Sequence, residues 1–186
     1  MNESTTIETP LGIIEIAGSA DADIKIRQGD LPLELPNGMV VDKAIAVILS
    51  IGIVNSCSDI VFSGRLLNDK IKGYPETGEC LDCITWETDE WALSIGTEDK
   101  EALERRLPNL MEKGMEYPIK YSRSGIKLNL SNVQPETPVS FHFVIAFKKL
   151  PDSRECSTWF AVDVPHKVAN KYIHTGVSSA ALHSHR

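Results

Sequence analysis

Apolar and polar positions alternate along much of this chain with the two-residue period of β-strands. The clearest case is Val139 to Leu150, in which one face of an extended segment carries Phe141, Phe143, Ile145 and Phe147. Shorter segments of the same type are also predicted to be strands: Leu11 to Ile16, Asp23 to Arg27, Asp59 to Leu67, Tyr117 to Tyr121, Ile126 to Leu130 and Thr158 to Val164. We expect the last of these to pair with Val139 to Leu150.

A hairpin is predicted around the polar segment Glu87-Thr88-Asp89-Glu90. If Trp86 lies opposite Trp91, one face carries all of the large apolar side chains: Ile84, Trp86, Trp91, Leu93 and Ile95. The other face then carries Cys83, Thr85, Ala92 and Ser94. The hairpin would therefore have an apolar inner face and an acidic tip.

One helix is clearly indicated, at about residues 97–107. Thr97 can serve as its N-cap, acidic residues occupy its first turn, and Arg105 and Arg106 come near its end. Met39 to Val54 has two interpretations. Its apolar positions fit a buried helix, whereas its many β-branched residues favour a strand, above all in the second half.

These elements together predict an α+β fold, a mostly antiparallel and strand-rich single domain with one clear helix and a possible second helix within 39–54. A chain of 186 residues has room for one well-cored domain. We expect the domain to span residues 1–176. Residues 177–186, which are mostly small or polar, are expected to form a frayed tail.

Charge is unevenly distributed along the chain. Residues 1–104 carry 20 acidic and 7 basic side chains, whereas residues 105–186 carry 6 acidic and 12 basic ones. Acidity peaks between Glu76 and Glu104, where ten carboxylates accompany one cation, Lys100. Such a region attracts basic partners and repels nucleic acid and anionic membranes.

This distribution predicts an acidic face that binds a basic protein. The expected contact residues are Asp82, Glu87, Asp89, Glu90, Glu98, Asp99 and Glu101. Carboxylates at this density would accelerate association with a cationic partner. The most concrete form of the hypothesis is a non-enzymatic inhibitor or immunity protein that neutralises a basic toxin, such as a nuclease.

The start of the chain is polar and lacks the pattern of a secretory signal, which leads us to expect a cytoplasmic protein. The longest apolar run, Ala44 to Val54, is about half of the ~20 residues that a membrane-spanning helix needs. A membrane partner is therefore not expected.

No catalytic residue, metal or cofactor is predicted. The chain has no Gly-x-Ser-x-Gly sequence and no glycine pattern that binds phosphate. Its five histidines form no helical ligand pair, and His142 is expected to be a polar residue opposite the phenylalanine face of its strand.

Two alternatives remain open. Cys80 and Cys83 have the Cys-x-x-Cys spacing that can hold zinc or act as a redox pair, so the protein could be organised around these thiols. Alternatively, the acidic and basic halves of different copies could attract each other, which would make the chain a structural subunit of a homo-oligomer.

Overall fold

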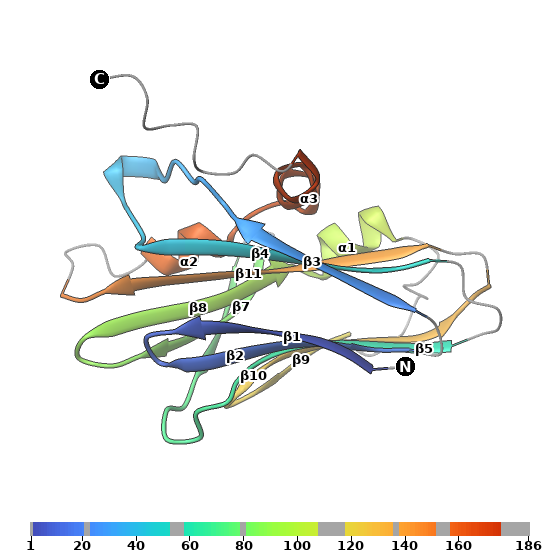
Figure 1. Cartoon of the computed structure of the whole chain (residues 1–186), viewed down its shortest axis with the longest axis horizontal. Helices are drawn as coiled ribbons and strands as arrows, with labels where there is room; N and C mark the ends of the chain where they lie inside the picture. Colours follow the sequence, from blue (N-terminus) through green and yellow to red (C-terminus); the bar gives the residue numbers. More distant parts are fainter. Residues whose placement is uncertain are drawn as a thin grey trace.

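The chain folds into two antiparallel β-sheets packed face to face, with short helices outside one of them (Figure 1). The structure, a computed structural model, describes residues 2–20, 23–52, 58–78, 81–107, 118–135, 138–151 and 157–175. This arrangement confirms the predicted strand-rich α+β class. The expected tail, residues 177–186, lies outside the described residues.

The first sheet has five strands in the order β1-β2-β5-β10-β9. Their bounds are Asn2–Thr9 for β1, Gly12–Ser19 for β2, Ser58–Leu66 for β5, Gly125–Val133 for β10 and Ile119–Ser122 for β9. β1 and β2 form a hairpin in which Gly12 has a φ of +130°, a conformation that L side chains rarely adopt. In the three central strands, buried side chains alternate with more exposed ones, so this sheet has one buried face and one outer face.

The second sheet has six strands in the order β3-β4-β11-β8-β7-β6. Their bounds are Ile24–Asp30 for β3, Lys43–Ile51 for β4, Val139–Lys149 for β11, Trp91–Glu98 for β8, Leu81–Glu87 for β7 and Tyr74–Gly78 for β6. β4, β11, β8 and β7 are buried on both faces, because one face meets the other sheet and the opposite face meets the helices.

The helical alternative for residues 39–54 is therefore wrong, since β4 occupies their centre. β4 lies between β3 and β11 and needs apolar side chains on both faces. A continuous run of apolar residues is what such a central strand requires, and it is also what made the segment resemble a buried helix.

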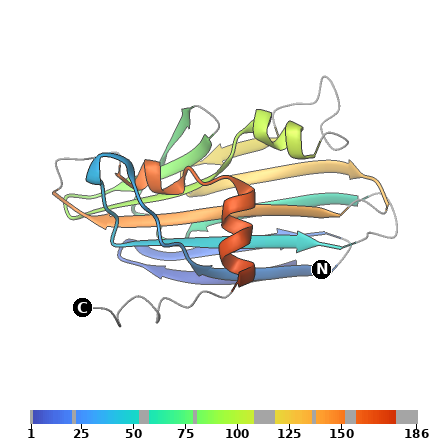
Figure 2. The same cartoon turned by 90° about the horizontal axis from the view of Figure 1, so that it is seen from above.

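Two apolar layers result from this arrangement. The core between the sheets includes Phe62 and Phe141, whose rings stack with centroids 5.5 Å apart, and the buried Trp86. The second layer lies between the outer face of the six-stranded sheet and two helices, α2 (Ser157–Val162) and α3 (His166–Thr175). Figure 2 shows these helices lying over the strands.

The predicted helix at 97–107 is present but begins later, as α1 at Lys100–Arg106. Asp99 is its N-cap, because the Asp99 carboxylate accepts a hydrogen bond from the Ala102 amide at 2.8 Å. Thr97, the N-cap predicted from the sequence, belongs instead to β8 and donates its hydroxyl to the His142 carbonyl at 2.8 Å.

The predicted hairpin is formed by β7 and β8, and the assignment of residues to its two faces is confirmed. Its register was wrong by two residues. Trp86 pairs with Leu93 rather than Trp91, and the turn is closed by a hydrogen bond from the Thr88 amide to the Trp91 carbonyl. A shift of two residues leaves each side chain on the same face, which is why the faces were predicted correctly.

Other expectations differ from the structure at specific segments. Thr158 to Val164 forms most of α2 and not a strand, and β11 pairs with β4 and β8. The apolar residues of α2 cover the outer face of the six-stranded sheet, so a helix buries these side chains as well as the predicted strand would have done. Two strands, β1 and β6, were not predicted at all.

Candidate functional site

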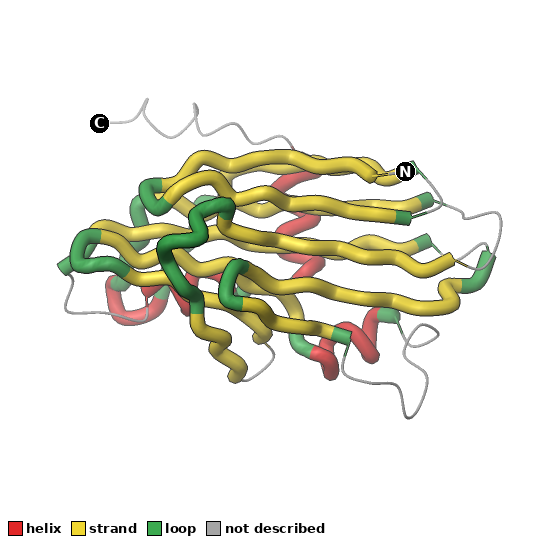
Figure 3. The backbone as a smooth tube through the Cα atoms, turned by 90° about the horizontal axis from the view of Figure 1, so that it is seen from below, coloured by secondary structure: helices red, strands yellow, loops and turns green. Residues whose placement is uncertain are grey.

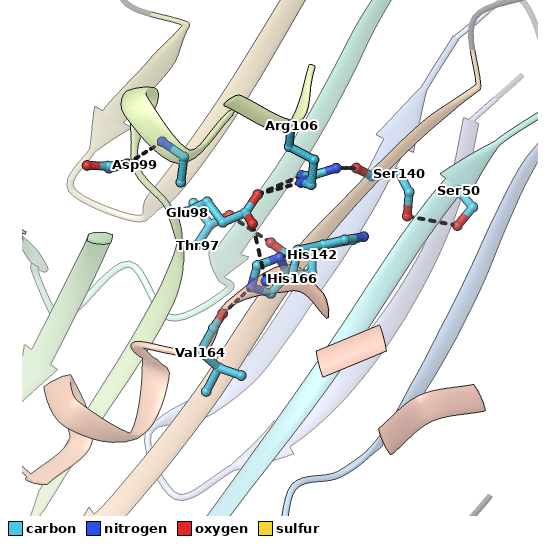
Figure 4. Close-up of polar contacts among 10 residues, drawn as sticks. Ser50, Thr97, Glu98, Asp99, Arg106, Ser140, His142, Val164 and His166 are labelled. Carbon is cyan, nitrogen blue, oxygen red and sulfur yellow. Dashed lines mark hydrogen bonds and ion pairs between the residues drawn. The ribbon is translucent and has the colours of Figure 1, made fainter. Parts of the chain in front are cut away.

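Three potential metal ligands meet at one end of the helix-covered face: Glu98, His142 and His166, which we call the His–Glu cluster (Figure 4). The β8–β11 ladder pairs Gly96 with Val144, and two residues further along both strands it places Glu98 beside His142. His166 is the first residue of α3, which crosses the sheet at this point. The cluster therefore joins two strands and a helix.

The cluster is compact and buried. Each residue offers one ligand-type atom such that these atoms all lie within 4.8 Å of one another. His142 is fully buried, and Glu98 and His166 are each 8% exposed. The Nδ1 atoms of the two imidazoles lie 3.1 Å apart.

The hydrogen bonds around the imidazoles define where their protons lie. The Val164 carbonyl, 2.8 Å from His142 Nε2, can only accept, so Nε2 of His142 carries a proton. Neutral His142 then presents a lone pair on Nδ1, and His166 donates its Nδ1 proton to it. Nε2 of neutral His166 keeps a lone pair and has no hydrogen-bond partner among the described residues.

Both imidazoles are held in the neutral form. Burial lowers the pKa of His142 to about 4 and that of His166 to about 3. The Arg106 guanidinium also contributes to lowering both pKa values, although for His142 the Glu98 carboxylate acts in the opposite direction. Neutral imidazole is the form that ligates a metal ion.

Arg106 of α1 neutralises the Glu98 carboxylate. Its Nε and Nη2 atoms donate to Glu98 Oε2 at 2.9 and 2.7 Å, and its Nη1 atom donates to the Ser140 carbonyl at 2.5 Å. Glu98 Oε1 accepts the backbone N–H of His166 at 3.2 Å. The contacts therefore connect α1, β8, β11 and the first residue of α3, and the charges within them balance.

The structure separates the seven acidic residues that were predicted to form one face. Glu87, Asp89 and Glu90 are exposed at the β7–β8 turn, and none of them forms an ion pair with a described residue. The remaining four, Asp82, Glu98, Asp99 and Glu101, lie at or just beyond the opposite end of the same two strands. The two groups are a strand length apart.

Three of those four carboxylates have structural contacts and the fourth is in a weak surface pair. Asp82 is buried between the sheets, where it accepts a hydrogen bond from the Tyr121 hydroxyl. Glu98 pairs with Arg106, and Asp99 caps α1. Glu101 is exposed and lies 3.8 Å from Arg105. The role of these residues in binding a partner stays a prediction, and the exposed ones are the three at the hairpin tip and Glu101.

Cys83 does not belong to a ligand cluster among the described residues, whose one such group is the His–Glu cluster. It is buried against the helix layer, and burial, aided by the nearby Glu76 carboxylate, raises the pKa of its thiol to about 12. A thiol with this pKa is a poor ligand and a poor nucleophile. Cys80 lies outside the described residues.

Sequence reasoning did not identify the His–Glu cluster. Its members are 24 and 44 residues apart, and none belongs to a short ligand motif. The available signal was weak, because Glu98 and His142 share their strand faces with other polar residues, Ser94 on β8 and Ser140 and Lys148 on β11.

Comparison with known proteins gives no family for this chain: no family model matches its sequence, and neither a curated protein nor a solved structure matches it. Among the described residues, none of the helices has the length and apolar character required to cross a membrane.

Proposed function

We propose that this protein binds a divalent transition-metal ion through Nδ1 of His142, Nδ1 of His166 and a carboxylate oxygen of Glu98. The observation that carries the proposal is the distance of 3.1 Å between the two Nδ1 atoms. Bonds of about 2.0–2.1 Å from zinc to imidazole nitrogen place two neighbouring ligands about 3.0–3.4 Å apart. The two imidazoles thus need little movement to share one ion.

The surroundings of His142 support this assignment. Metal-bound histidines usually donate the second ring N–H to a carbonyl or carboxylate, which fixes the ring and its tautomer. His142 does this through Nε2 to the Val164 carbonyl. Its Nδ1 lone pair consequently points toward His166 and Glu98 in the required protonation state.

Metal binding requires one proton to change position. In the metal-free protein the His166 Nδ1 proton lies between the two rings. Moving it to His166 Nε2, which has no described partner, gives both rings an Nδ1 lone pair without charging either ring. Arg106 can keep its contacts with Glu98 Oε2 as an outer partner of the ligating carboxylate.

Three protein ligands of this kind leave a position for water or another small ligand. Nitrogen and oxygen donors suit zinc, iron and their neighbours in the first transition series. The proposal therefore names the class of ion, and zinc and cobalt are suitable probes.

The contact between Arg106 and Glu98 favours a second candidate role for the His–Glu cluster, which is purely structural. Because Arg106 already neutralises Glu98, the same residues can serve solely as a buried polar link between α1, α3 and the sheet. The two functions differ in a measurable way, since a purely structural link has no affinity for metal.

The test is a titration of chelator-treated protein with Co²⁺, followed by visible absorption, and with Zn²⁺, followed by calorimetry. The variants are His166→Gln and, as a control, His174→Gln, which changes an exposed histidine at the other end of α3. All proteins carry His183→Asn and His185→Asn so that these two histidines do not contribute.

The expected result is one equivalent of metal bound by the reference protein and by His174→Gln. His166→Gln should lose more affinity than the roughly 10- to 100-fold that removal of an outer-shell partner costs. Bound metal should also raise the stability of the reference protein, by about 2.7 kcal/mol at a free concentration 100 times the Kd. Absence of binding, or equal binding by both variants, would overturn the proposal.

A further inference from the structure

The outer face of the five-stranded sheet has no helix over it, in contrast to the outer face of the other sheet (Figure 3). Its side chains come from alternate residues of β1, β2, β5, β10 and β9. In the described part of the chain, no helix or further strand covers this open face.

One row of residues across this face divides into a small half and a long half. The register pairs Ser4 with Ala17, Ala17 with Ser63, Ser63 with Lys127, and Lys127 with Lys120. Ser63 lies on β5, the central strand of the five. On one side of Ser63, small side chains therefore lie on the first and second strands away from it. On the other side, lysines lie on the first and second strands away.

The small half is also hollow. A groove of about 280 Å³ lies over β1, β2 and β5, and its lining includes Ser4, Ala17, Ser63 and, from the neighbouring rows, Glu15, Ser19 and Val61. Glu15 supplies a carboxylate at the groove. That carboxylate is 2.7 Å from Arg65 Nε and is still partly exposed.

Charge follows the same division. The outward residues of β1 and β2 include Glu8 and Glu15, whereas those of β10 and β9 include Lys127 and Lys120. One side of the face is thus acidic and concave, and the other is basic and carries long side chains. After a rotation of 180°, the acidic half of one copy faces the basic half of another.

We propose that a second copy of this chain binds to the open face about a two-fold axis that lies between the two copies, parallel to β5 and above Ser63. The rotation exchanges β2 with β10 and β1 with β9. It places Lys127 of the partner subunit over Ala17, where its ammonium group can reach the Glu15 carboxylate, and Lys120 of the partner subunit over Ser4. Each contact occurs twice, as in any isologous dimer.

The size of the face makes the dimer a modest one. Four strands of eight or nine residues and the four-residue β9, spaced about 4.8 Å apart with about 3.3 Å per residue, cover roughly 600 Å² per copy. The total of roughly 1,200 Å² is at the lower limit for specific interfaces. Its charged contacts lie near solvent, so the dimer should dissociate on dilution and at high salt.

Sedimentation velocity over a range of protein concentrations, at low and at high salt, tests this proposal. Ala17→Lys places a lysine where the lysine of the partner subunit must enter, and should raise the dissociation constant at least about tenfold. Adding Lys127→Ala to the same chain exchanges the small side chain and the lysine between the two positions. The double variant should recover most of the lost dimer affinity. Lys25→Ala, on β3 of the other sheet, is the matched control and should have no effect.

Thermal unfolding of each variant verifies that the fold is intact, as expected for substitutions of outward-facing residues on a strand. A protein that is monomeric at all concentrations would overturn the proposal. So would a dimer whose dissociation constant is unchanged by Ala17→Lys, or one that the double variant does not restore. The metal titration reports on residues of the other sheet and of α3, so the two proposals can fail independently.

Discussion

The two outer faces of this sandwich come from the same kind of strand and have opposite characters. On the six-stranded sheet, the outward residues of the central strands combine a buried apolar cluster with buried polar side chains such as Ser94, Glu98 and His142, and α2 and α3 lie over them. On the five-stranded sheet, the outward residues are mostly polar or charged and no described element covers them. In both sheets, inward and outward residues alternate along the strands. Apolar side chains among the outward residues determine whether a helix must cover that face.

Whether a face is covered or open also determines how its polar side chains are hydrogen-bonded. Among the described residues, no fully buried side-chain nitrogen or oxygen atom lacks a hydrogen-bond partner, and the contacts on the covered face include the His–Glu cluster and a chain from Glu76 through Thr85 and Ser94 to Thr158. On the open face, water can satisfy a polar side chain. Polar residues on the covered face should therefore have large effects on stability, and those on the open face small ones.

Acidification should have the largest effect on the free energy of unfolding, because it acts on histidines of the covered face. Burial holds His142 and His166 neutral in the folded state, with pKa values of about 4 and 3, whereas unfolded histidine titrates near 6.5. Below pH 6.5 the unfolded chain binds more protons than the folded one, so the free energy of unfolding falls as the pH falls. The loss should reach about 3 kcal/mol for each histidine by pH 4.

Urea unfolding of metal-free protein between pH 7 and pH 4 measures this effect. His166→Asn should unfold with a clearly smaller dependence on pH, while His174→Gln should follow the original protein. Identical slopes for all three proteins would show that the buried histidines do not control acid stability.

Removal of the Glu98 carboxylate should give the next largest effect. Glu98→Ala leaves the partly buried Arg106 guanidinium without its partner and should cost about 3 kcal/mol of unfolding free energy, near the lower limit for a fully buried pair. Glu101→Ala is the control on the adjacent helix. Its exposed pair with Arg105 should contribute less than about 0.5 kcal/mol. Similar losses in chemical denaturation would contradict the assigned difference in burial.

A matched pair of threonines compares the two faces directly. Thr158 of α2 is buried and accepts a hydrogen bond from Ser94, whereas Thr6 of β1 is exposed on the open face. The nearly isosteric change Thr158→Val should cost about 1–2 kcal/mol, because it leaves a buried donor with fewer partners. Thr6→Val should change the unfolding free energy by less than about 0.5 kcal/mol. A larger effect at Thr6 would reverse the comparison.

The exposed hairpin tip should have the smallest effect on stability. Replacing Glu87, Asp89 and Glu90 together by Gln should alter the unfolding free energy by less than about 0.5 kcal/mol, since none of them forms an ion pair with a described residue. If the tip is the predicted docking site for a basic protein, the same variant should lose that partner in affinity capture.

The control for the capture experiment is Glu101→Gln with Glu104→Gln, which removes two exposed carboxylates from α1. Retention of every captured protein by the tip variant would remove Glu87, Asp89 and Glu90 from the binding site. The role as an inhibitor of a basic toxin remains a prediction that this experiment can support or exclude.

Local sequence patterns were sufficient for much of the fold. The phenylalanine face of β11 and both faces of the β7–β8 hairpin follow from alternation alone, because the direction of a side chain in a strand depends on its own backbone. The hairpin register does not follow from alternation. Offsets of two residues bury the same side chains, so only the hydrogen bonds of the turn distinguish them.

The class of an apolar segment also depended on its neighbours. β4 and α2 both combine β-branched and apolar residues, yet one is a central strand and the other covers the sheet. Each buries its apolar side chains successfully. The choice between them is made by the sheet available for pairing, which no local pattern describes.

The sequence by itself determined that this protein would be strand-rich and antiparallel, and that its acidic residues would concentrate in the first half. Only the tertiary structure decided where those acids lie, burying Asp82 and Glu98 and leaving the hairpin tip exposed. It alone also brought His142 and His166 to Glu98 from separate elements. The physical reason is range: alternation acts between adjacent residues, whereas the cluster depends on sheet register and helix docking between segments far apart in the chain.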